Sequence, residues 1–321
     1  MIGEKIRLAL VGAGAFGVKH LEGLAAIEGA AVVSLVGKNA TSAHDIAKRF
    51  GINHVGSSLE ECLARSDVDA VILCTPTPLH AKQAVACLLA GKHVQVEIPL
   101  ADSLAGAVEI ARAQRETGLV AMGGHTRRFN PSHRWIHRRV EESAFSLLHM
   151  DVQTFFHRRT NTNALGQLRE WTDHLLWHHA AHTVDLFAWQ ARSPIVVARA
   201  LQGPRHPELG IAMDMSVQLQ AANGAICTLA LSFNNDGPFG SWFRYIGDTG
   251  TYLARYDGLF DASGGTVDLR DVDVSMNGIE LQDREFLAAI REGREAVTSV
   301  GQLLPCYRVL HALGQGLEGS H

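Results

Sequence analysis

Several features that mark particular protein classes are missing from this 321-residue sequence. It has no apolar run near the roughly 20 residues that a membrane span requires, and its first residues, MIGEKI, show no signal-peptide pattern. The five cysteines form no C-x-x-C pair, which is typical of reduced thiols. Asp and Glu (33) outnumber Lys and Arg (29), and the net charge of −4 argues against a nucleic-acid partner. We therefore expect a cytoplasmic protein that binds neither membrane nor nucleic acid.

The N-terminal part of the chain alternates apolar runs of strand length with segments of helical periodicity. Strands are expected at 6–14, 30–37, 69–75, 93–97 and 119–124, with helices at 15–27, 43–50, 79–90 and 104–117 between them. This alternation predicts an α/β fold with a doubly wound parallel sheet. We expect a dinucleotide-binding domain over residues 1–125 and a substrate-binding and oligomerisation domain over 126–321, whose C-terminal helices can pack back on the first domain.

A glycine-rich turn follows the first expected strand. Gly12, Gly14 and Gly17 form a G-x-G-x-x-G pattern that encloses Ala15 and Phe16. Glycines at this place allow a tight turn and close approach of a pyrophosphate, while the N-terminus of the next helix offers N–H groups to the phosphates. The sequence therefore predicts a dinucleotide site at these five residues.

The end of the second expected strand has no acid that could hold a ribose 2′-hydroxyl. It reads Gly37, Lys38, Asn39, followed shortly by Thr41. A small residue followed by a cation and hydroxyl or amide groups suits a 2′-phosphate, so we expect NADP, with NAD as the weaker alternative. Lys38 can also be a solvated surface charge.

Two further segments follow strands of the same expected sheet. Thr75 and Pro76 come after the strand at 69–75, and His80 either starts the next helix or faces a ligand. Glu97 and Pro99 stand where the chain leaves the strand at 93–97. We expect these residues to contact the cofactor, because ligands of such folds bind at the carboxyl ends of the strands.

A family resemblance rests on several segments taken together, namely GAGAFG, CTPTPLHA, GKHVQVEIPL, RRFNP and HTVDLF. They resemble the glucose-fructose oxidoreductase and inositol dehydrogenase family (Gfo/Idh/MocA) of two-domain dinucleotide enzymes. The resemblance implies a Rossmann-like first domain and a second α/β domain with a large open, mostly antiparallel sheet that often serves subunit association. It also implies hydride transfer in the cleft between the domains, and a homodimer.

The sequence departs from the family pattern at two positions. Ile98 stands where most members have a lysine between glutamate and proline, and His178 replaces the acid of an Asp-x-x-x-His pair whose histidine matches His182. Both changes remove charges suited to oxidising a sugar alcohol. They imply a different substrate, or a catalytically silent protein.

A histidine-rich segment is expected to form one helix over 171–187. His174, His178 and His182 are four residues apart and would share a face, and Asp185, one turn beyond, could orient His182. Histidine accepts protons near neutral pH, so His182 or His178 is the expected general base.

The remaining histidines of this segment have a simpler alternative. His174 and His179 can merely cap or pack. A His-x-x-x-His pair can also bind zinc, but no glutamate or cysteine ligand accompanies it, so no metal is expected.

Arginines concentrate between residues 124 and 169, although the chain is acidic overall. Some, such as Arg138 and Arg139 beside two glutamates, suit a solvated helix face. Others are expected in the substrate site, because arginine binds carboxylates through two parallel hydrogen bonds. The expected substrate ligands are Arg127, Arg128, Arg158, Arg159, Trp177 and His178.

These features, with the resemblance, imply an oxidoreductase of aromatic catabolism that uses NADP to oxidise the cyclic hemiacetal form of a dicarboxylated semialdehyde. Glu97 and Pro99 would then shape the nicotinamide floor, and Ile98 would replace a lysine that competes for the substrate. None of the five cysteines lies in a nucleophile motif. The alternatives are a sugar or cyclitol dehydrogenase of the same family and a silent NADP-binding sensor.

Overall fold

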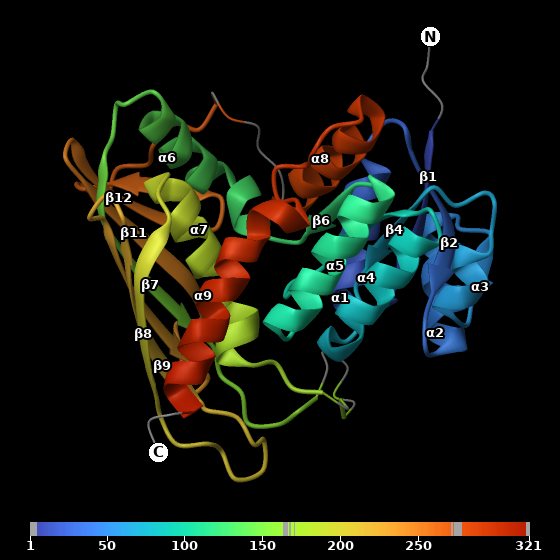
Figure 1. Cartoon of the computed structure of the whole chain (residues 1–321), viewed down its shortest axis with the longest axis horizontal. Helices are drawn as coiled ribbons and strands as arrows, with labels where there is room; N and C mark the ends of the chain where they lie inside the picture. The colour runs from blue at the N-terminus through green and yellow to red at the C-terminus, as the bar shows by residue number, and fades with distance from the viewer. Residues whose placement is uncertain are drawn as a thin grey trace. The chain divides into compact units, whose positions relative to one another are not determined.

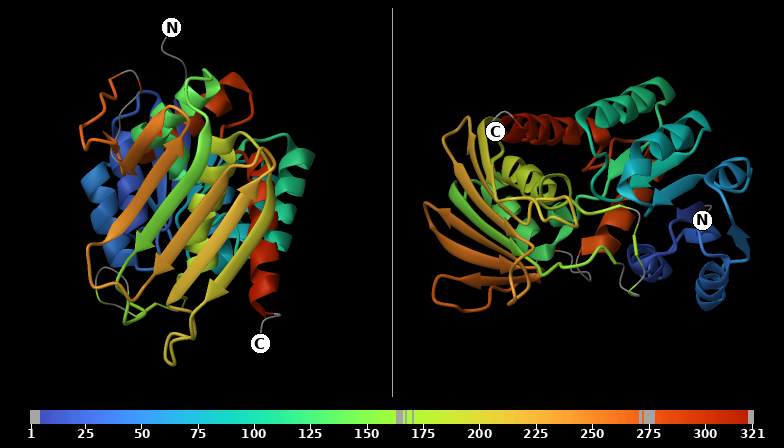
Figure 2. Two further views of the ribbon diagram at one scale, coloured as in Figure 1. Left: turned by 90° about the vertical axis from the view of Figure 1, so that its left-hand side faces the viewer. Right: turned by 90° about the horizontal axis from the view of Figure 1, so that it is seen from below.

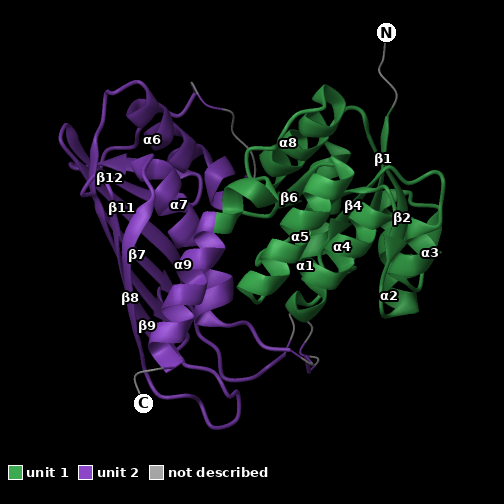
Figure 3. Cartoon of the chain, viewed as in Figure 1, with its two compact units in different colours: residues 1–125, 279–304 green, residues 126–278, 305–321 purple. Residues whose placement is uncertain are grey.

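The structure is a computed structural model that describes residues 5–162, 166, 168–169, 171–270, 272 and 278–318. The chain divides into two compact units (Figure 3). Unit 1 comprises residues 1–125 and 279–304, and unit 2 comprises residues 126–278 and 305–321. The chain therefore leaves unit 1, returns to it near the C-terminus, and leaves it again within its last helix.

Unit 1 contains a six-stranded sheet in the order β3-β2-β1-β4-β5-β6 (Figure 1). All of its strand pairs are parallel. The strands are β1 (Ile6–Val11), β2 (Ala30–Val36), β3 (His54–Gly56), β4 (Ala70–Leu73), β5 (His93–Val96) and β6 (Ala121–Gly123). The strand order reverses between β1 and β4, and the carboxyl ends of these strands are where such sheets bind ligands. The predicted parallel sheet is confirmed.

Helices connect these strands and cover their apolar side chains. They are α1 (Ala15–Ala25), α2 (Ala40–Phe50), α3 (Leu59–Leu63), α4 (His80–Leu89), preceded by the 3-10 turn η1 (Thr77–Leu79), and α5 (Leu104–Thr117), with α8 (Ile279–Glu292) returning from the C-terminal part. Side chains of Asn39, Ser58 and Ser103 cap α2, α3 and α5. The strands β1 and β4 are almost entirely buried, as expected for a sheet covered on both faces.

Unit 2 contains a seven-stranded sheet in the order β13-β12-β11-β7-β10-β9-β8. Its strands are β7 (Leu147–Phe155), β8 (Ile195–Gln202), β9 (Asp214–Ala221), β10 (Ile226–Ser232), β11 (Gly240–Gly247), β12 (Gly250–Arg255) and β13 (Gly258–Asp261). All pairs are antiparallel except β7 with β10. The mostly antiparallel sheet is therefore confirmed. Asn223 and Gly224 lie in the turn between β9 and β10, where Gly224 has φ +92°.

Helices cover one face of this sheet (Figures 1 and 2). They are η2, a 3-10 turn (Thr126–Phe129), α6 (Pro131–Glu141), η3, a π-helical segment (Leu175–Ala180), α7 (Ala181–Ala191) and most of α9 (Val300–Glu318). The alternation of buried and exposed residues along β9 and β10 turns apolar side chains toward these helices. Within the described residues no helix covers the opposite face, and none of the described helices is long and apolar enough to span a membrane.

Candidate active site

The glycine turn of unit 1 has the geometry that a dinucleotide needs. Gly12 has φ +110°, and a Cβ there would lie 2.3 Å from the carbonyl oxygen of Cys74, at the end of the neighbouring strand β4. A Cβ on Gly17 would lie 2.1 Å from the carbonyl oxygen of Gly12. Gly14, in contrast, would place a Cβ in space that contains no described atom within 4 Å. Two glycines are therefore required by close packing, and the third leaves room for a ligand.

The first turn of α1 is open toward this space. Gly14 is the N-cap, and among the described residues no side chain accepts a hydrogen bond from the first N–H groups of the helix. Phe16 is half exposed beside it. An uncapped helix N-terminus next to an empty space at a topological switch point fits a pyrophosphate.

The end of β2 offers small and polar side chains next to the glycine turn. A Cβ on Gly37 would lie 3.1 Å from the Cβ of Ala13, so only glycine fits there without displacement. Lys38 and Thr41 are exposed. Asn39 has a local role as well, since its Oδ1 accepts a hydrogen bond from the backbone N–H of Ser42 at 3.0 Å and so caps α2.

His80 starts helix α4 and is almost completely buried. Its Nδ1 lies 2.7 Å from the carbonyl oxygen of Pro99, and its Nε2 lies 2.7 Å from that of Thr75. Both ring nitrogens of His80 lie within hydrogen-bonding distance of backbone carbonyl groups, which favours the alternative in which His80 starts the helix over a ligand-facing role. Instead, this ring joins the two loops that follow β4 and β5, and so fixes the positions of Thr75 and Pro99.

Glu97 follows β5 and is buried beside a histidine that the sequence did not single out. Its Oε1 lies 3.1 Å from Nε2 of His20, in α1, and 3.4 Å from Nε2 of Gln282, in α8. Ile98 is half buried and Pro99 is buried. The acid of the Glu97–Pro99 turn is thus held by two elements that are distant from it in sequence.

The histidine segment of unit 2 differs from the expected single helix. Helix geometry begins at Leu175 with a π-helical segment, η3, and the N-cap is His174. The prediction that His174 shares a helix face with His178 and His182 is therefore wrong. His178 lies in η3 and His182 in α7, so their four-residue spacing crosses a change of helix type, which is frequent at functional sites.

The surroundings of His178 define its state. Its Nδ1 accepts a hydrogen bond from the backbone N–H of His174 at 2.9 Å, and its ring stacks on Trp171 with centroids 5.6 Å apart. Its Nε2 lies 3.9 Å from Oδ1 of Asp173. A neutral His178 therefore carries its proton on Nε2, and it cannot accept another proton without losing the bond to His174.

Two other residues of the segment pack. The ring of His179 lies 5.4 Å from that of Phe156 and 5.1 Å from that of Phe233. Burial lowers the pKa of His179 to about 4, so it is neutral at physiological pH. Trp177 packs against Tyr307 of α9, with ring centroids 6.3 Å apart.

Two of the four arginines expected to bind substrate have carboxylate partners within the described part of unit 2. Arg128 binds Asp185 through two hydrogen bonds of 2.8 and 2.5 Å, and the two side chains are 7% and 3% exposed. Arg158 pairs with Asp173, which also accepts a hydrogen bond from Arg169 at 3.3 Å. Arg128 and Asp185 thus form a buried internal pair, which favours a structural role for Arg128 over the expected role as a substrate ligand.

The remaining two arginines differ in exposure. Arg159 is exposed, and its Nη1 donates to Oδ1 of Asn234 at 3.0 Å. Arg127 lies over the rings of Phe243 and Tyr256, each about 5.6 Å from the guanidinium carbon, and donates to Oδ1 of Asn130 at 3.3 Å. Its Nε has no hydrogen-bond partner among the described residues, and no described carboxylate forms an ion pair with it. Burial lowers the pKa of Arg127, and the charge of nearby Asp257 offsets this only in part.

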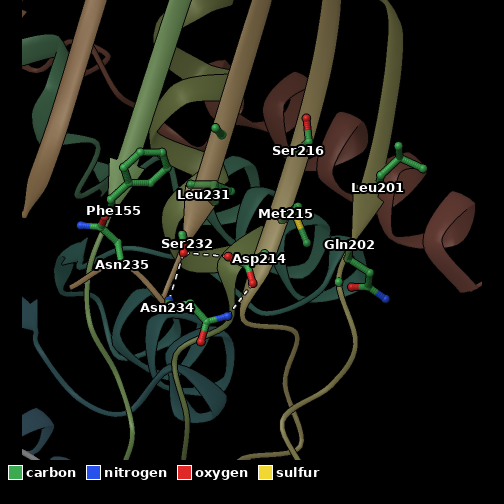
Figure 4. A pocket seen from close by; sticks show the side chains of 12 residues that line it. Phe155, Leu201, Gln202, Asp214, Met215, Ser216, Leu231, Ser232, Asn234 and Asn235 are labelled. Carbon is green, nitrogen blue, oxygen red and sulfur yellow. Dashed lines mark hydrogen bonds between the residues drawn. The ribbon is translucent and has the colours of Figure 1, made fainter. Parts of the chain in front are cut away.

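Two adjoining concavities lie on the open face of the unit 2 sheet, and no candidate site residue is among those that line them, although Arg159 donates to the lining residue Asn234. Figure 4 shows the first, where Ser232 and Asn234 both donate hydrogen bonds to Asp214, at 2.7 and 2.5 Å. The second lies over β7, β11 and β12 and shares Phe155 and Asn235 with the first. Among the described residues no group of three His, Cys, Asp or Glu side chains could hold a metal ion.

Comparison with known proteins agrees with this architecture. Residues 6–125 match the family model described as "Oxidoreductase family, NAD-binding Rossmann fold", and residues 131–273 match "Bacterial oxidoreductases, C-terminal". A 4-carboxy-2-hydroxymuconate-6-semialdehyde dehydrogenase of Sphingobium sp. (strain NBRC 103272 / SYK-6) is 63% identical over 98% of this chain and 99% of its own length. The chain belongs to the Gfo/Idh/MocA family of oxidoreductases.

More distant members of the Gfo/Idh/MocA family match as well. An inositol 2-dehydrogenase of Acidothermus cellulolyticus is 28% identical over 77% of this chain and 72% of its own. The crystal structure of an oxidoreductase domain protein from Kribbella flavida superimposes with a TM-score of 0.86 at 20% identity, covering 99% of this chain and 98% of that one. The family assignment makes this protein an oxidoreductase with a nicotinamide cofactor.

Proposed function

We propose that this protein is an NADP-dependent dehydrogenase that oxidises the cyclic hemiacetal form of 4-carboxy-2-hydroxymuconate-6-semialdehyde to 2-pyrone-4,6-dicarboxylate, in protocatechuate 4,5-cleavage. The observation that carries the proposal is the 63% identity, over nearly the whole chain, to a dehydrogenase named for that semialdehyde. The absence of a lysine at Ile98 supports it against a sugar or cyclitol substrate.

The cofactor would lie along the carboxyl edge of the unit 1 sheet. The open space at Gly14 and the uncapped N-terminus of α1 fit its pyrophosphate, and Glu97 and Pro99 would border the nicotinamide. When bound, the oxidised nicotinamide accepts a hydride from the substrate carbon. No acid stands at the end of β2 and Lys38 is exposed there, which supports a 2′-phosphate and hence NADP.

Arg127 is the arginine we assign to a substrate carboxylate. A half-buried arginine with a buried, unused Nε–H and no ion pair to a carboxylate among the described residues gains most from an anionic ligand. Arg159 is exposed, and its hydrogen bonds to described residues all come from Nη1, so it is the candidate for the second carboxylate. Arg158 and Arg169, bound to Asp173, would fix the loop around this site.

His182 is the base we assign to the hydroxyl proton of the hemiacetal. The hydrogen bond from His174 to Nδ1 of His178 leaves His178 with only an N–H to offer, so His178 can donate to the substrate but not accept its proton. The hydroxyl proton of the hemiacetal passes to His182, and the carbon that bears this hydroxyl gives up its hydrogen as a hydride. That carbon becomes the carbonyl carbon of the lactone in the product.

A thiol nucleophile does not contribute to this mechanism. Burial raises the pKa of all five cysteine thiols, Cys62, Cys74, Cys87, Cys227 and Cys306. A protonated, buried thiol is a poor nucleophile, and oxidation of a hemiacetal needs no thiohemiacetal.

The test is an absorbance assay that follows the formation of reduced nicotinamide. The reaction contains NADP or NAD and the semialdehyde, which a ring-cleaving dioxygenase generates from protocatechuate. Formation of NADPH with a pyrone dicarboxylate as product supports the proposal. Cofactor binding without reduction would indicate a sensor, and turnover of inositols or sugars instead would indicate a cyclitol or sugar dehydrogenase.

We further propose that the protein is a homodimer formed through the open face of the unit 2 sheet. This face carries the two concavities and exposed apolar side chains, including Leu201, which is 75% exposed. The change Leu201→Glu should convert the dimer to a monomer in light scattering coupled to gel filtration. A wild-type monomer, or a dimer unaffected by this change, would contradict the proposal.

A further inference from the structure

A buried ion cluster in unit 1 joins Glu97 to His20 and Asp283, two residues that the mechanism above does not use. His20, in α1, is completely buried. Its Nδ1 lies 2.9 and 3.0 Å from the two carboxylate oxygens of Asp283, in α8, and its Nε2 lies 3.1 Å from Oε1 of Glu97. Because both ring nitrogens face carboxylate oxygens, both must donate, and the ring is an imidazolium.

The groups around this cluster support the charged form. Burial by itself would lower the pKa of His20, but the charge of Asp283 and its hydrogen bonds raise it well above the usual value. Burial opposes ionisation of Glu97, and the hydrogen bond and charge of His20 outweigh it and lower the pKa of Glu97. The other titratable groups that face the cluster are the thiol of Cys74, after β4, and the ring of His80, in α4.

The two carboxylates are also held by neutral groups. Nε2 of Gln95, in β5, donates to Oδ1 of Asp283 at 2.8 Å, and Nε2 of Gln282 lies 3.4 Å from Oε1 of Glu97. Every hydrogen bond given for the Glu97 carboxylate within the described residues therefore falls on Oε1. Its other oxygen, Oε2, is left for a ligand donor.

The cluster connects the elements that border the proposed cofactor site. His20 lies on the helix that begins at the glycine turn, and Glu97 lies at the end of β5, two strands away from β1 in the sheet. Asp283 fixes the ring from the opposite side. The ring can therefore set the position of Glu97 relative to the glycine turn.

We propose that His20 is a positioning residue, clasped between Asp283 and Glu97, that keeps the Glu97 carboxylate ionised and directs its free Oε2 toward an amide donor of the bound nicotinamide cofactor. The inference rests on the proposed function, because it takes Glu97 as a cofactor contact. It predicts that loss of His20 weakens cofactor binding through the protonation state of Glu97.

The primary variant is His20→Gln, with His93→Gln as the matched control. His93 lies at the start of β5 and is partly buried. It accepts a hydrogen bond from the N–H of Val120 at 3.0 Å, and in the described residues its ring forms no hydrogen bond or ion pair with a carboxylate. The measurement is the dissociation constant of NADPH by fluorescence titration of the full chain between pH 6 and 9. Circular dichroism verifies that each variant is folded.

At pH 6 we expect NADPH to bind His20→Gln about tenfold more weakly than wild type, the size of one lost charge-assisted hydrogen bond. Without the imidazolium, burial raises the pKa of Glu97, so the carboxylate is protonated first at low pH. The ratio of variant to wild-type dissociation constants should therefore fall as pH rises. His93→Gln should keep a ratio near one throughout.

A second variant keeps the proposal testable if His20→Gln does not fold. Asp283→Asn preserves the size and the acceptor oxygen while removing the charge that keeps His20 protonated, and it should show the same pH trend with a smaller amplitude.

If the ratio of the His20→Gln to the wild-type dissociation constant is near one, or does not change with pH, the proposed role of His20 is refuted. A general loosening of the fold would weaken binding equally at every pH. Failure of wild type to bind NADPH would instead refute the proposed function. The two failures are therefore distinguishable.

Discussion

The candidate residues of unit 1 and those of unit 2 were both inferred from short sequence patterns, but they differ in how far the structure leaves them available to a ligand. In unit 1 the glycine turn leaves open space and unused N–H groups. In unit 2 two of the four arginines expected to meet a ligand are paired with internal carboxylates, Arg128 with Asp185 and Arg158 with Asp173. A glycine turn in the sequence indicates the backbone geometry of a binding site. An arginine or a histidine in the sequence does not indicate whether its side chain binds another residue of the protein or a ligand.

The sharpest contrast within unit 2 is between adjacent arginines. Arg127 and Arg128 follow one another in the chain, and only Arg128 has a carboxylate partner in the described part of the unit. His178 and His182 form a second such pair, since His178 is committed to His174. The following changes test this division between structural and ligand-directed residues.

The largest effect is expected from His182→Ala. Loss of a general base should lower kcat by about 10²- to 10⁴-fold with NADPH binding retained. Steady-state kinetics with the semialdehyde, together with fluorescence titration of the cofactor, measure both. His178→Asn should cost much less if His178 is only a donor, and an equal loss in the two variants would remove the distinction between them.

Arg128→Met should act on stability. It leaves the Asp185 carboxylate, 3% exposed, without its counter-charge, so the free energy of unfolding should fall by about 3–5 kcal/mol in urea titrations. The matched control is Arg138→Met, whose partner Glu142 and own side chain are each 54% exposed and whose loss should cost well under 1 kcal/mol. Similar values for the two variants would contradict the structural role of Arg128.

Arg127→Met should lower activity without lowering stability, the opposite of the result expected for Arg128→Met. We expect kcat/KM for the semialdehyde to fall by about 10- to 100-fold, the cost of one charged hydrogen-bond donor, while the urea midpoint stays constant or rises. The rise would follow because burial opposes the Arg127 cation in the free protein. A fall in stability with unchanged kinetics would place Arg127 with Arg128 instead.

The smallest effect concerns the cofactor specificity of unit 1. Because Lys38 is exposed, Lys38→Ala should weaken the preference for NADP over NAD by about tenfold or less without changing kcat. Values of kcat/KM for the two cofactors give the preference. An unchanged ratio would show that Lys38 is a solvated charge.

Much of the fold could be predicted from the sequence because its signals are local. Apolar runs of strand length and G-x-G-x-x-G are read within a few residues, and the strands and the turn occur where expected. The partners of the charged residues could not be predicted in this way. His20 and Asp283 are 263 positions apart, and neither belongs to a recognisable motif.

The histidine segment shows a different limit. A spacing of four residues indicates one face only for a regular α-helix, and the π-helical segment Leu175–Ala180 changes that geometry. His80 shows a third limit of prediction from sequence. Its ring is buried between two backbone carbonyl groups, and this position depends on the path of the loop after β5.

The return of the chain to unit 1 also bears on how the protein is made. Asp283 lies in a segment that joins unit 1 only after residues 126–278 have been synthesised. At 5–20 residues per second, the first 125 residues therefore wait roughly 8 to 30 s for the helix that completes their fold. During translation His20 and Glu97 meet without the second carboxylate, so the nascent unit should be less stable than the finished one and more dependent on chaperones.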